Sequence, residues 1–288
     1  MRVAIQGETG SFSHEAALAL APDADLVPCA LSAEVFEQLV AGAVDAAVIP
    51  IENSLAGSVL EHYDLLLAHP VHIEREQLLR IRHNLIAAEG ATLDALCTVF
   101  SHPIALAQCR GFFRQHPHLQ PASFYDTAGS VKHILSLDGR PESKKWGAIA
   151  SRQAALRFGG RLLAEGIEDN PENYTRFFLL RAGTPDQASA IPSPDEEQRG
   201  KVSLCFMVEN RCGSLVDALQ VFADEQINLT RIESRPVPGS PWQYIFYADY
   251  ELQEPSRAEA AVRRLAPHCS MIKELGRYPA APPLPVSG

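Results

Sequence analysis

The sequence lacks the features that mark several large classes of protein. Its 288 residues include 35 acidic and 25 basic residues, and no run of lysines and arginines occurs. A nucleic-acid-binding protein is expected to show a basic stripe, so this class is disfavoured. No apolar stretch approaches the roughly 18 residues of a membrane-spanning helix. The opening MRVAIQGETG is strand-like and has no apolar leader segment, so we expect no signal peptide.

Cysteine pairs and metal-binding patterns are also missing. The six cysteines are scattered without a C-x-x-C pair, which indicates reduced thiols and a cytoplasmic location. His62, His69 and His72 do not follow the H-E-x-x-H spacing, so we expect no catalytic metal. The turn at Gly7 to Gly10 lacks the G-x-G-x-x-G and G-K-[ST] patterns, so a nucleotide-binding loop is not predicted.

The chain does contain the composition of two folded units. Residues 182–200 hold three prolines and clustered acids, which is typical of a linker. The linker separates a first unit, residues 1–181, from a second unit, residues 201–279. The proline-rich tail, residues 280–288, is expected to be disordered. Hydrophobic residues make up 46% of the chain, which is ample for a sizeable core.

Short apolar runs alternate with helical patterns in the first unit, which indicates an α/β fold. The runs are residues 3–5, 46–51, 97–100, 146–150 and 177–180. The first four lead into polar turns containing glycine or serine, each predicted to open a helix. Because ligands of open α/β sheets bind beyond the carboxyl ends of the strands, these turns predict one polar cleft.

The second unit follows the β-α-β-β-α-β order of a ferredoxin-like domain. Its predicted elements are strands at 202–208, 227–236, 242–252 and 271–275 and helices at 214–226 and 256–268. The first strand alternates in polarity, and the first helix is amphipathic. This fold by itself does not identify a function.

Two polar turns in the first half of the chain could act on a ligand. GETGSFSH, residues 7–14, presents backbone N–H groups at a helix start, where an anion would be attracted. A tight turn with an N-capping serine is the simpler explanation of that stretch alone. In PIENSLAGSV, residues 50–59, Asn53 offers a donor and an acceptor to a ligand. An Asx-turn would explain the same asparagine.

Two further stretches lie later in the same unit. SHPIALAQC is predicted to begin a helix with Ser101 as N-cap, which would place Gln108 on the same helical face. An exposed glutamine is the alternative. In NYTRFFLL, Thr175 and Arg176 precede an apolar strand. If that strand is antiparallel to the others, both residues enter the cleft, where arginine suits a carboxylate. A surface ion pair is the alternative for the arginine.

Together these stretches resemble the prephenate dehydratase family, in the order that the family shows. The matching motifs are Gly7–His14, Pro50–Ser54, Ser101–Cys109 and Thr175–Phe177, and in the second unit Gly213–Val216 and Glu233–Pro236. The second unit resembles the regulatory ACT domain. Glu8, Ser11, Ile104 and Ser214 depart from the residues common at their positions. No additional helical segment precedes the first motif, so we expect a monofunctional enzyme.

The resemblance covers residues 2–279. It implies a two-lobed, periplasmic-binding-protein-like catalytic domain followed by a ferredoxin-like ACT domain. The implied reaction is the loss of carbon dioxide and water from prephenate to form phenylpyruvate, by a hydro-lyase that needs no cofactor. Arogenate dehydratase, a sister family of the same architecture, is an alternative. A non-catalytic, amino-acid-responsive binding protein is another, although binding alone would not require the threonine of T-R-F.

The resemblance also implies roles for individual residues. Thr175 is expected to donate a hydrogen bond or a proton to the leaving hydroxyl, and Asn53 and Gln108 to orient the substrate. The implied substrate-binding residues are Thr9, Gly10, Ser11, Phe12, Glu52, Ser54, Ser101, His102, Arg176 and Phe177. Arg176 would either bind a carboxylate or brace the cleft.

An ACT domain implies allosteric control by L-phenylalanine, whose direction the resemblance leaves open. The implied allosteric residues are Gly213, Ser214, Leu215, Val216, Asn228, Leu229, Glu233 and Ser234. The effector site would lie between two copies of the domain, so we expect a homodimer or homotetramer. No nucleic-acid or membrane partner is expected.

Overall fold

The computed structural model describes residues 1–137, 140–184, 200–237, 239–252 and 254–282. The chain separates into two compact units, Met1–Tyr63 with Gln77–Leu179, and Asp64–Glu76 with Leu180–Gly288. Most of the predicted linker, residues 185–199, lies outside the described residues, and so does the predicted tail from residue 283 onward.

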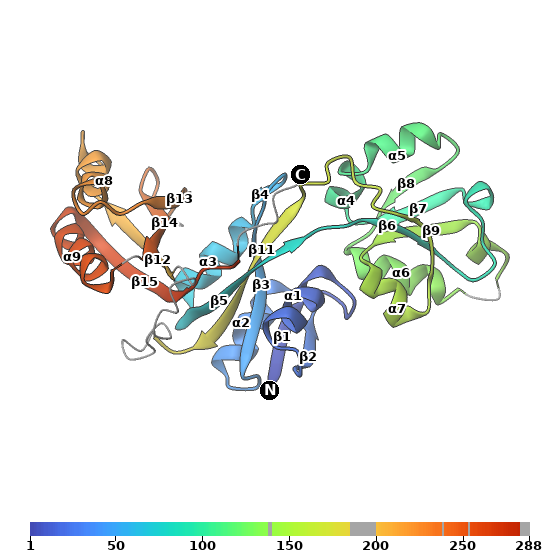
Figure 1. Cartoon of the computed structure of the whole chain (residues 1–288), viewed down its shortest axis with the longest axis horizontal. Coiled ribbons are helices and arrows are strands. Elements are labelled where there is room, and N and C mark those ends of the chain that lie inside the picture. The colour runs from blue at the N-terminus through green and yellow to red at the C-terminus, as the bar shows by residue number, and fades with distance from the viewer. Residues whose placement is uncertain (138–139, 185–199, 238, 253, 283–288) are drawn as a thin grey trace. The chain divides into compact units, whose positions relative to one another are not determined.

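The secondary structure follows the predicted alternation of strands and helices (Figure 1). The N-terminal part contains β1 (Arg2–Gln6), α1 (Phe12–Leu20), β2 (Asp25–Cys29), α2 (Ser32–Val40), β3 (Ala46–Asn53), β4 (Gly57–Ser58), α3 (Leu60–Ala68) and β5 (Val71–Arg80). The middle part contains β6 (Asn84–Ala87), β7 (Thr98–Ser101), α4 (Pro103–Ala107), α5 (Arg110–Gln115), β8 (Gln120–Ser123), α6 (Thr127–Leu135), β9 (Trp146–Ala150), α7 (Arg152–Phe158), β10 (Arg161–Glu165) and β11 (Tyr174–Ala182). The C-terminal part contains β12 (Gly200–Val208), α8 (Ser214–Asp224), β13 (Leu229–Pro236), β14 (Tyr244–Leu252), α9 (Pro255–Leu265) and β15 (Cys269–Pro279). Short 3₁₀ turns lie at Leu93–Ala95, Pro141–Lys144 and Ala266–His268.

The first sheet has the strand order β2-β1-β3-β11-β5, with β4 paired to β3. β1 is parallel to both neighbours, and its residues Val3, Ala4 and Ile5 are fully buried, as expected for a strand covered on both faces. The start of β11 lies beside the carboxyl ends of β3 and β5, because Ser54 N–H donates to Tyr174 O and Ile81 N–H to Asn173 O. β11 therefore runs opposite to both, the orientation that the prediction required.

The second sheet has the order β10-β6-β9-β7-β8, in which β7 is parallel to β8 and β9 and antiparallel pairs join β6 to β9 and β10. Helices cover both faces (Figure 1). α4 and α5 pack on the face that carries Leu85 and Ile149, and α6 and α7 on the face that carries Ile86 and Ala148. Two sheets, each with its own helices, form the two predicted lobes.

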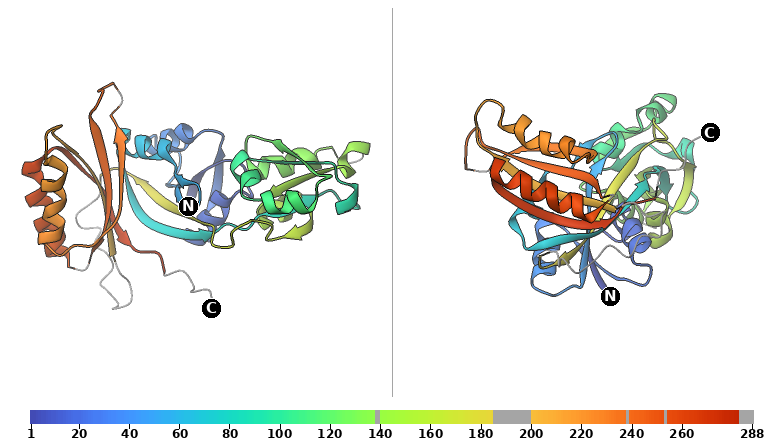
Figure 2. Two further views of the ribbon diagram at one scale, coloured as in Figure 1. Left: turned by 90° about the horizontal axis from the view of Figure 1, so that it is seen from above. Right: turned by 60° about the vertical axis from the view of Figure 1, so that its left-hand side comes forward.

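The third sheet is antiparallel, with the order β13-β14-β12-β15. The apolar face of β12, with Val202, Leu204 and Phe206, packs against α8 and α9, which lie side by side in Figure 2. The ferredoxin-like prediction is thus confirmed.

On β15, the ammonium of Lys273 donates to three carbonyl oxygens at the end of α3, at 2.8 to 3.0 Å. A cation at this position is favourable because the helix C-terminus is negative.

No helix within the described ranges combines the length and the apolar character needed to cross a membrane.

Candidate active site

Asn53 lies at the carboxyl end of β3, where the chain turns into β4. Its Oδ1 accepts the backbone N–H groups of Leu55 and Ala56, at 3.1 and 2.8 Å. This Asx-turn determines which side of the amide faces the turn. The Nδ2 group points the other way and donates to Asn173 Oδ1 at 2.7 Å and to Thr175 Oγ1 at 2.9 Å. The Asx-turn, one of the two explanations that the sequence offered, is therefore present, and the other side of the amide bonds side chains of the protein itself.

Three side-chain amides close a ring of hydrogen bonds. Asn53 donates to Asn173, Asn173 Nδ2 donates to Gln108 Oε1 at 2.9 Å, and Gln108 Nε2 reaches back to Asn53 Oδ1 at 3.4 Å. The first member ends β3, the second precedes β11, and the third caps the C-terminus of α4. Each amide both donates and accepts, so the Asx-turn at Asn53 sets the direction of the whole ring.

Thr175 stands beside this ring at the start of β11 and is 8% exposed. Its Oγ1 accepts the hydrogen bond from Asn53, and no other hydrogen bond among the described residues involves this hydroxyl. The O–H proton is therefore available to a ligand. An oxygen that already accepts a hydrogen bond is also a stronger donor. The structure thus brings Asn53, Gln108 and Thr175 together as a polarised donor group.

Two members of the cluster were not assigned a role from the sequence. Asn173 is fully buried, and His83 is 2% exposed with its Nε2 at 2.9 Å from Gln108 Oε1. The Phe12 ring meets the His83 ring edge-on, at 5.7 Å between centroids. Burial lowers the pKa of His83, against smaller opposing effects of its bond to Gln108 and of the Glu168 charge. The sequence signals available for these two residues were an asparagine two positions before Thr175 and a histidine directly before the apolar strand at residues 84–87.

The first glycine-rich turn makes its hydrogen bonds within the first unit. Gly10 N–H donates to His14 Nδ1 at 2.8 Å, and Ser11 N–H donates to Glu8 O at 3.1 Å. Ser11 Oγ caps α1 by accepting from His14 N–H. The N-cap explanation therefore holds, and these two N–H groups already have partners. Thr9 Oγ1 lies 3.4 Å from Arg157 Nε.

Gly10 is required by its surroundings. Its φ is +92°, and a Cβ there would lie 2.8 Å from the backbone of Ala154. Ser151 Oγ donates to Gly10 O at 2.6 Å and also caps α7 by accepting from Ala154 N–H. The turn before α1 is therefore held against the start of α7.

The predicted helix cap at Ser101 is wrong. Ser101 ends β7, and its Oγ donates to Ile149 O of β9 at 2.6 Å. α4 begins one residue later than expected, because Pro103 occupies its first position and His102 caps it. The helix has only five residues and ends before Gln108. Ser101 and Gln108 therefore do not share a helical face, and Gln108 reaches the ring from the C-cap.

The alternation of β11 separates Thr175 from Arg176. Arg176 points to the opposite face, is 8% exposed, and stacks over the Phe178 ring at 4.7 Å. Phe177 is buried in the core with Val3 and other apolar residues of the first sheet. This geometry favours the brace over the carboxylate ligand for Arg176, and it makes Phe177 a core residue.

The remaining residues of the second motif hold two strands together. Glu52 pairs with Ser58 in the β3–β4 hairpin. Ser54 Oγ donates to Glu172 O and accepts from Tyr174 N–H, both at 3.0 Å. Ser54 thus attaches the end of β3 to the start of β11, next to Thr175.

The predicted allosteric residues lie around the start of α8 and along β13 in the C-terminal ferredoxin-like domain. Gly213, with φ of +87°, precedes α8, Ser214 is buried, Leu215 packs into the core, and Val216 is exposed. Their predicted partners lie on β13 or just before it: Asn228 and Ser234 are exposed, Leu229 packs against the core, and Glu233 pairs with Arg231. The 11 residues of α8 separate Gly213 from Asn228 by about 16 Å. One small amino acid cannot contact both Gly213 and Asn228 within one copy.

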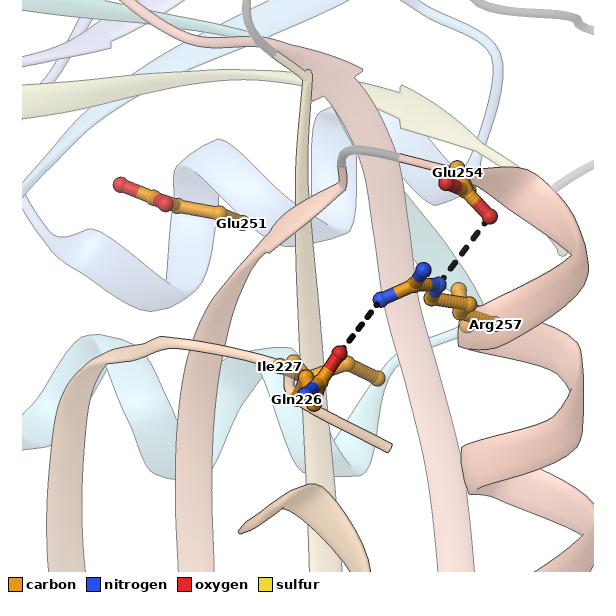
Figure 3. A pocket seen from close by; sticks show the side chains of 6 residues that line it. Gln226, Ile227, Glu251, Glu254 and Arg257 are labelled. Atoms are coloured by element: carbon orange, nitrogen blue, oxygen red, sulfur yellow. Dashed lines mark hydrogen bonds and ion pairs between the residues drawn. The ribbon is translucent and has the colours of Figure 1, made fainter. Parts of the chain in front are cut away.

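A pocket on the same domain is lined by Gln226, Ile227, Glu251, Glu254, Arg257 and Ala258 (Figure 3). Arg257 already bonds Glu254 at 3.0 Å and Gln226 at 3.4 Å. The Glu251 side chain points away from Arg257 and its two partners (Figure 3). We assign this pocket no role.

Across the described ranges, no group of three or more histidine, cysteine, aspartate or glutamate side chains could hold a metal ion.

The chain is similar to known proteins over most of its length. A family model described as prephenate dehydratase matches residues 3–185. Arogenate dehydratase 2 of Petunia hybrida is 39% identical over 295 residues, which cover 97% of this chain and 72% of the relative.

Two solved structures are similar over nearly the whole chain. The prephenate dehydratase of Arthrobacter aurescens in complex with L-Phe is 30% identical, with a TM-score of 0.85 over 96% of this chain and 90% of that one. A protein described as a novel type of quorum quenching acylase is 31% identical, with a TM-score of 0.86 over 98% and 99%.

Proposed function

Because the chain belongs to the prephenate dehydratase family and is a hydro-lyase, we propose that it converts prephenate to phenylpyruvate with loss of carbon dioxide and water. The observation that supports this reaction best is the Thr175 hydroxyl, which accepts from Asn53 and keeps its proton for a ligand. A buried donor aimed at a departing oxygen is the group that such an elimination requires.

The proposed step is a concerted elimination. The bond between the ring and its carboxylate breaks, and its electron pair enters the ring, so that carbon dioxide leaves. The ring electrons expel the hydroxyl at the opposite carbon, and the ring becomes aromatic. Thr175 donates its hydrogen bond to the departing oxygen, on which negative charge develops. The released hydroxide becomes water by taking a proton from the solvent. Because aromatisation supplies the driving force, the enzyme has only to stabilise this charge and hold the substrate.

The three amides are proposed to orient the donor and the substrate. Asn53 holds Thr175 Oγ1 by its Nδ2 group, so the threonine proton must point away from Asn53. Gln108 Nε2 has two protons, and its one partner among the described residues is Asn53 Oδ1 at 3.4 Å. Its other proton would bind the substrate hydroxyl or a carboxylate.

The experiment compares Thr175→Ala with Thr175→Ser, using purified protein and prephenate. The alanine variant should lose at least about a hundredfold in kcat, the usual effect of removing one such donor, whereas the serine variant keeps the hydroxyl and should keep most of the turnover. Thermal unfolding of both variants checks the fold. Near-normal turnover by Thr175→Ala would overturn the assignment.

Arogenate is the second candidate substrate, because a relative that is 39% identical is named arogenate dehydratase. The two substrates differ in an amino group in place of the keto group. Parallel assays that measure phenylpyruvate from prephenate and L-phenylalanine from arogenate give two values of kcat/KM. We propose prephenate as the better substrate, and a higher kcat/KM for arogenate would reverse this choice.

An acylase activity finds less support, although one similar structure carries that description. Acyl transfer needs a nucleophile paired with a base. Ser32 Oγ lies 3.0 Å from His62 Nε2, and His62 Nδ1 faces Pro50 O, which resembles such a pair. Both side chains are buried, however, so a substrate would not reach the serine.

We also propose that L-phenylalanine binds between the ACT domains of two copies, in a cytoplasmic homodimer or homotetramer. The similar structure of Arthrobacter aurescens contains L-Phe, and the separation of Gly213 from Asn228 favours a site built from two copies. Calorimetric titration with L-phenylalanine, with the mass in solution measured by light scattering, tests both parts. A monomer that binds L-phenylalanine normally would contradict the two-copy site.

A further inference from the structure

His83 is held rigidly beside the amide ring. It lies between β5 and β6, and its backbone N–H donates to Glu168 Oε2 at 2.9 Å. Its carbonyl oxygen accepts Ile167 N–H at 2.9 Å. The Phe12 ring contacts the imidazole edge-on. With the backbone bonded on both sides and the ring 2% exposed, the imidazole has one position available.

The imidazole presents a single donor to the site. Nε2 lies 2.9 Å from Gln108 Oε1, and an oxygen there can only accept, so Nε2 carries the proton. Nδ1 is buried and has no hydrogen-bond partner. A second proton at Nδ1 would be a buried cationic N–H without an acceptor, which is costly. The ring therefore stays neutral, with Nε2–H directed at Gln108.

Gln108 Oε1 is placed between two donors, His83 Nε2 and Asn173 Nδ2, both at 2.9 Å. A reversed amide would direct an NH₂ group at both of them, and three donors would have no acceptor. Asn173 and His83 together exclude the reversed amide: the Asx-turn at Asn53 sets the direction of Asn173, and the Nε2–H of His83 adds a second donor to the same oxygen. The remaining orientation points Nε2 of Gln108 toward Asn53 and toward the side of the ring where Thr175 lies.

We propose that His83 is a positioning residue of the dehydratase reaction: its Nε2–H fixes the amide of Gln108 so that Nε2 donates to the substrate. The inference rests on the proposed function, in which Gln108 contacts the substrate. It assigns no substrate contact to His83, and it predicts that His83 acts only through Gln108.

A double-mutant cycle tests this role. His83→Phe keeps an aromatic ring against Phe12 but removes the donor, and should lower kcat/KM by about tenfold, equivalent to about 1.4 kcal/mol. His83→Gln restores an N–H near the Nε2 position and should stay within about threefold of wild type. In a Gln108→Ala background, His83→Phe should have no further effect, because the group that it positions is gone.

His133→Phe is the matched control. His133 lies on α6, stacks on Phe124 and Trp146, and has no contact with the amide ring. This variant should keep the kcat/KM of wild type. It shows what the same substitution does elsewhere in the catalytic unit.

The outcomes separate the two proposals. A wild-type protein without activity on prephenate or arogenate would overturn the proposed function. An active wild type in which His83→Phe and Gln108→Ala multiply their effects would overturn only the role of His83. If His83→Phe does not fold, His83→Gln decides, since a tenfold loss in a stable His83→Gln would also overturn the positioning role.

Discussion

Asn53→Asp is the most informative single substitution, because it replaces one donor of the amide ring with an acceptor without changing the shape of the side chain. The aspartate keeps an oxygen at the Oδ1 position, so the Asx-turn to Leu55 and Ala56 survives. The second oxygen replaces Nδ2 and faces Asn173 Oδ1 and Thr175 Oγ1, at the present 2.7 and 2.9 Å. Of these two oxygens, only Thr175 Oγ1 carries a proton. It can therefore turn its O–H toward the new carboxylate and donate to it.

The effect on turnover should exceed that on stability. Thr175 would donate to the carboxylate and no longer to the departing hydroxyl, so kcat should fall by about a hundredfold to a thousandfold, the effect of losing one transition-state donor. The free energy of unfolding should fall by about 2 to 4 kcal/mol, because hydrogen bonds to Asn173 and Tyr174 are replaced by contacts between acceptors.

The loss of unfolding free energy in Asn53→Asp should depend on pH. Burial and the facing oxygens should raise the pKa of the new carboxyl in the folded state. Protonation restores a donor, so the deficit in unfolding free energy is largest above this raised pKa and shrinks as the pH falls through it. Thermal unfolding of Asn53→Asp and Asn53→Ala from pH 4.5 to 8, with prephenate turnover at neutral pH, measures both effects. An Asn53→Asp variant with turnover within tenfold of wild type, or a deficit that grows at low pH, would refute the reasoning.

Three further outcomes follow from single contacts. Gly10→Ala should lower the free energy of unfolding by about 2 kcal/mol or more, because its Cβ would meet a backbone atom of α7 at 2.8 Å. Gly42→Ala, also at positive φ but in open space, should cost clearly less in the same thermal melts. Arg176→Gln should lower Tm, because the stack on Phe178 is lost, with less than a threefold change in KM; a tenfold higher KM at unchanged Tm would instead support the carboxylate-ligand role. Burial lowers the pKa of His83, so the folded state favours its neutral form. Its contribution to stability is complete above pH about 6.5 and is lost as the pH falls toward the folded pKa, and His83→Gln should flatten this part of a stability profile measured by denaturant unfolding.

The amino-acid sequence alone determined five strands of the first unit and the order of the helices and strands in the second unit. Apolar runs such as Val3–Ile5 and Trp146–Ala150 became buried strands, and the alternation of Val202, Leu204 and Phe206 became the inner face of the ferredoxin-like sheet. These features depend on hydrophobic periodicity, which acts over a few neighbouring residues. The side-chain period of two also places Arg176 and Thr175 on opposite faces of β11, although the prediction directed both side chains into the cleft.

Only the tertiary structure decided how the polar residues of the site are connected. Asn53 and Asn173 are 120 residues apart, and His83 meets Gln108 across 25, so no local pattern relates them. Ser101 was misassigned because its partner, Ile149 O, belongs to a neighbouring strand. The motif could name Thr175, but the direction of its proton depends on the amide of Asn53. That amide is oriented by a turn on one side and by β11 on the other, and only folding brings the two together.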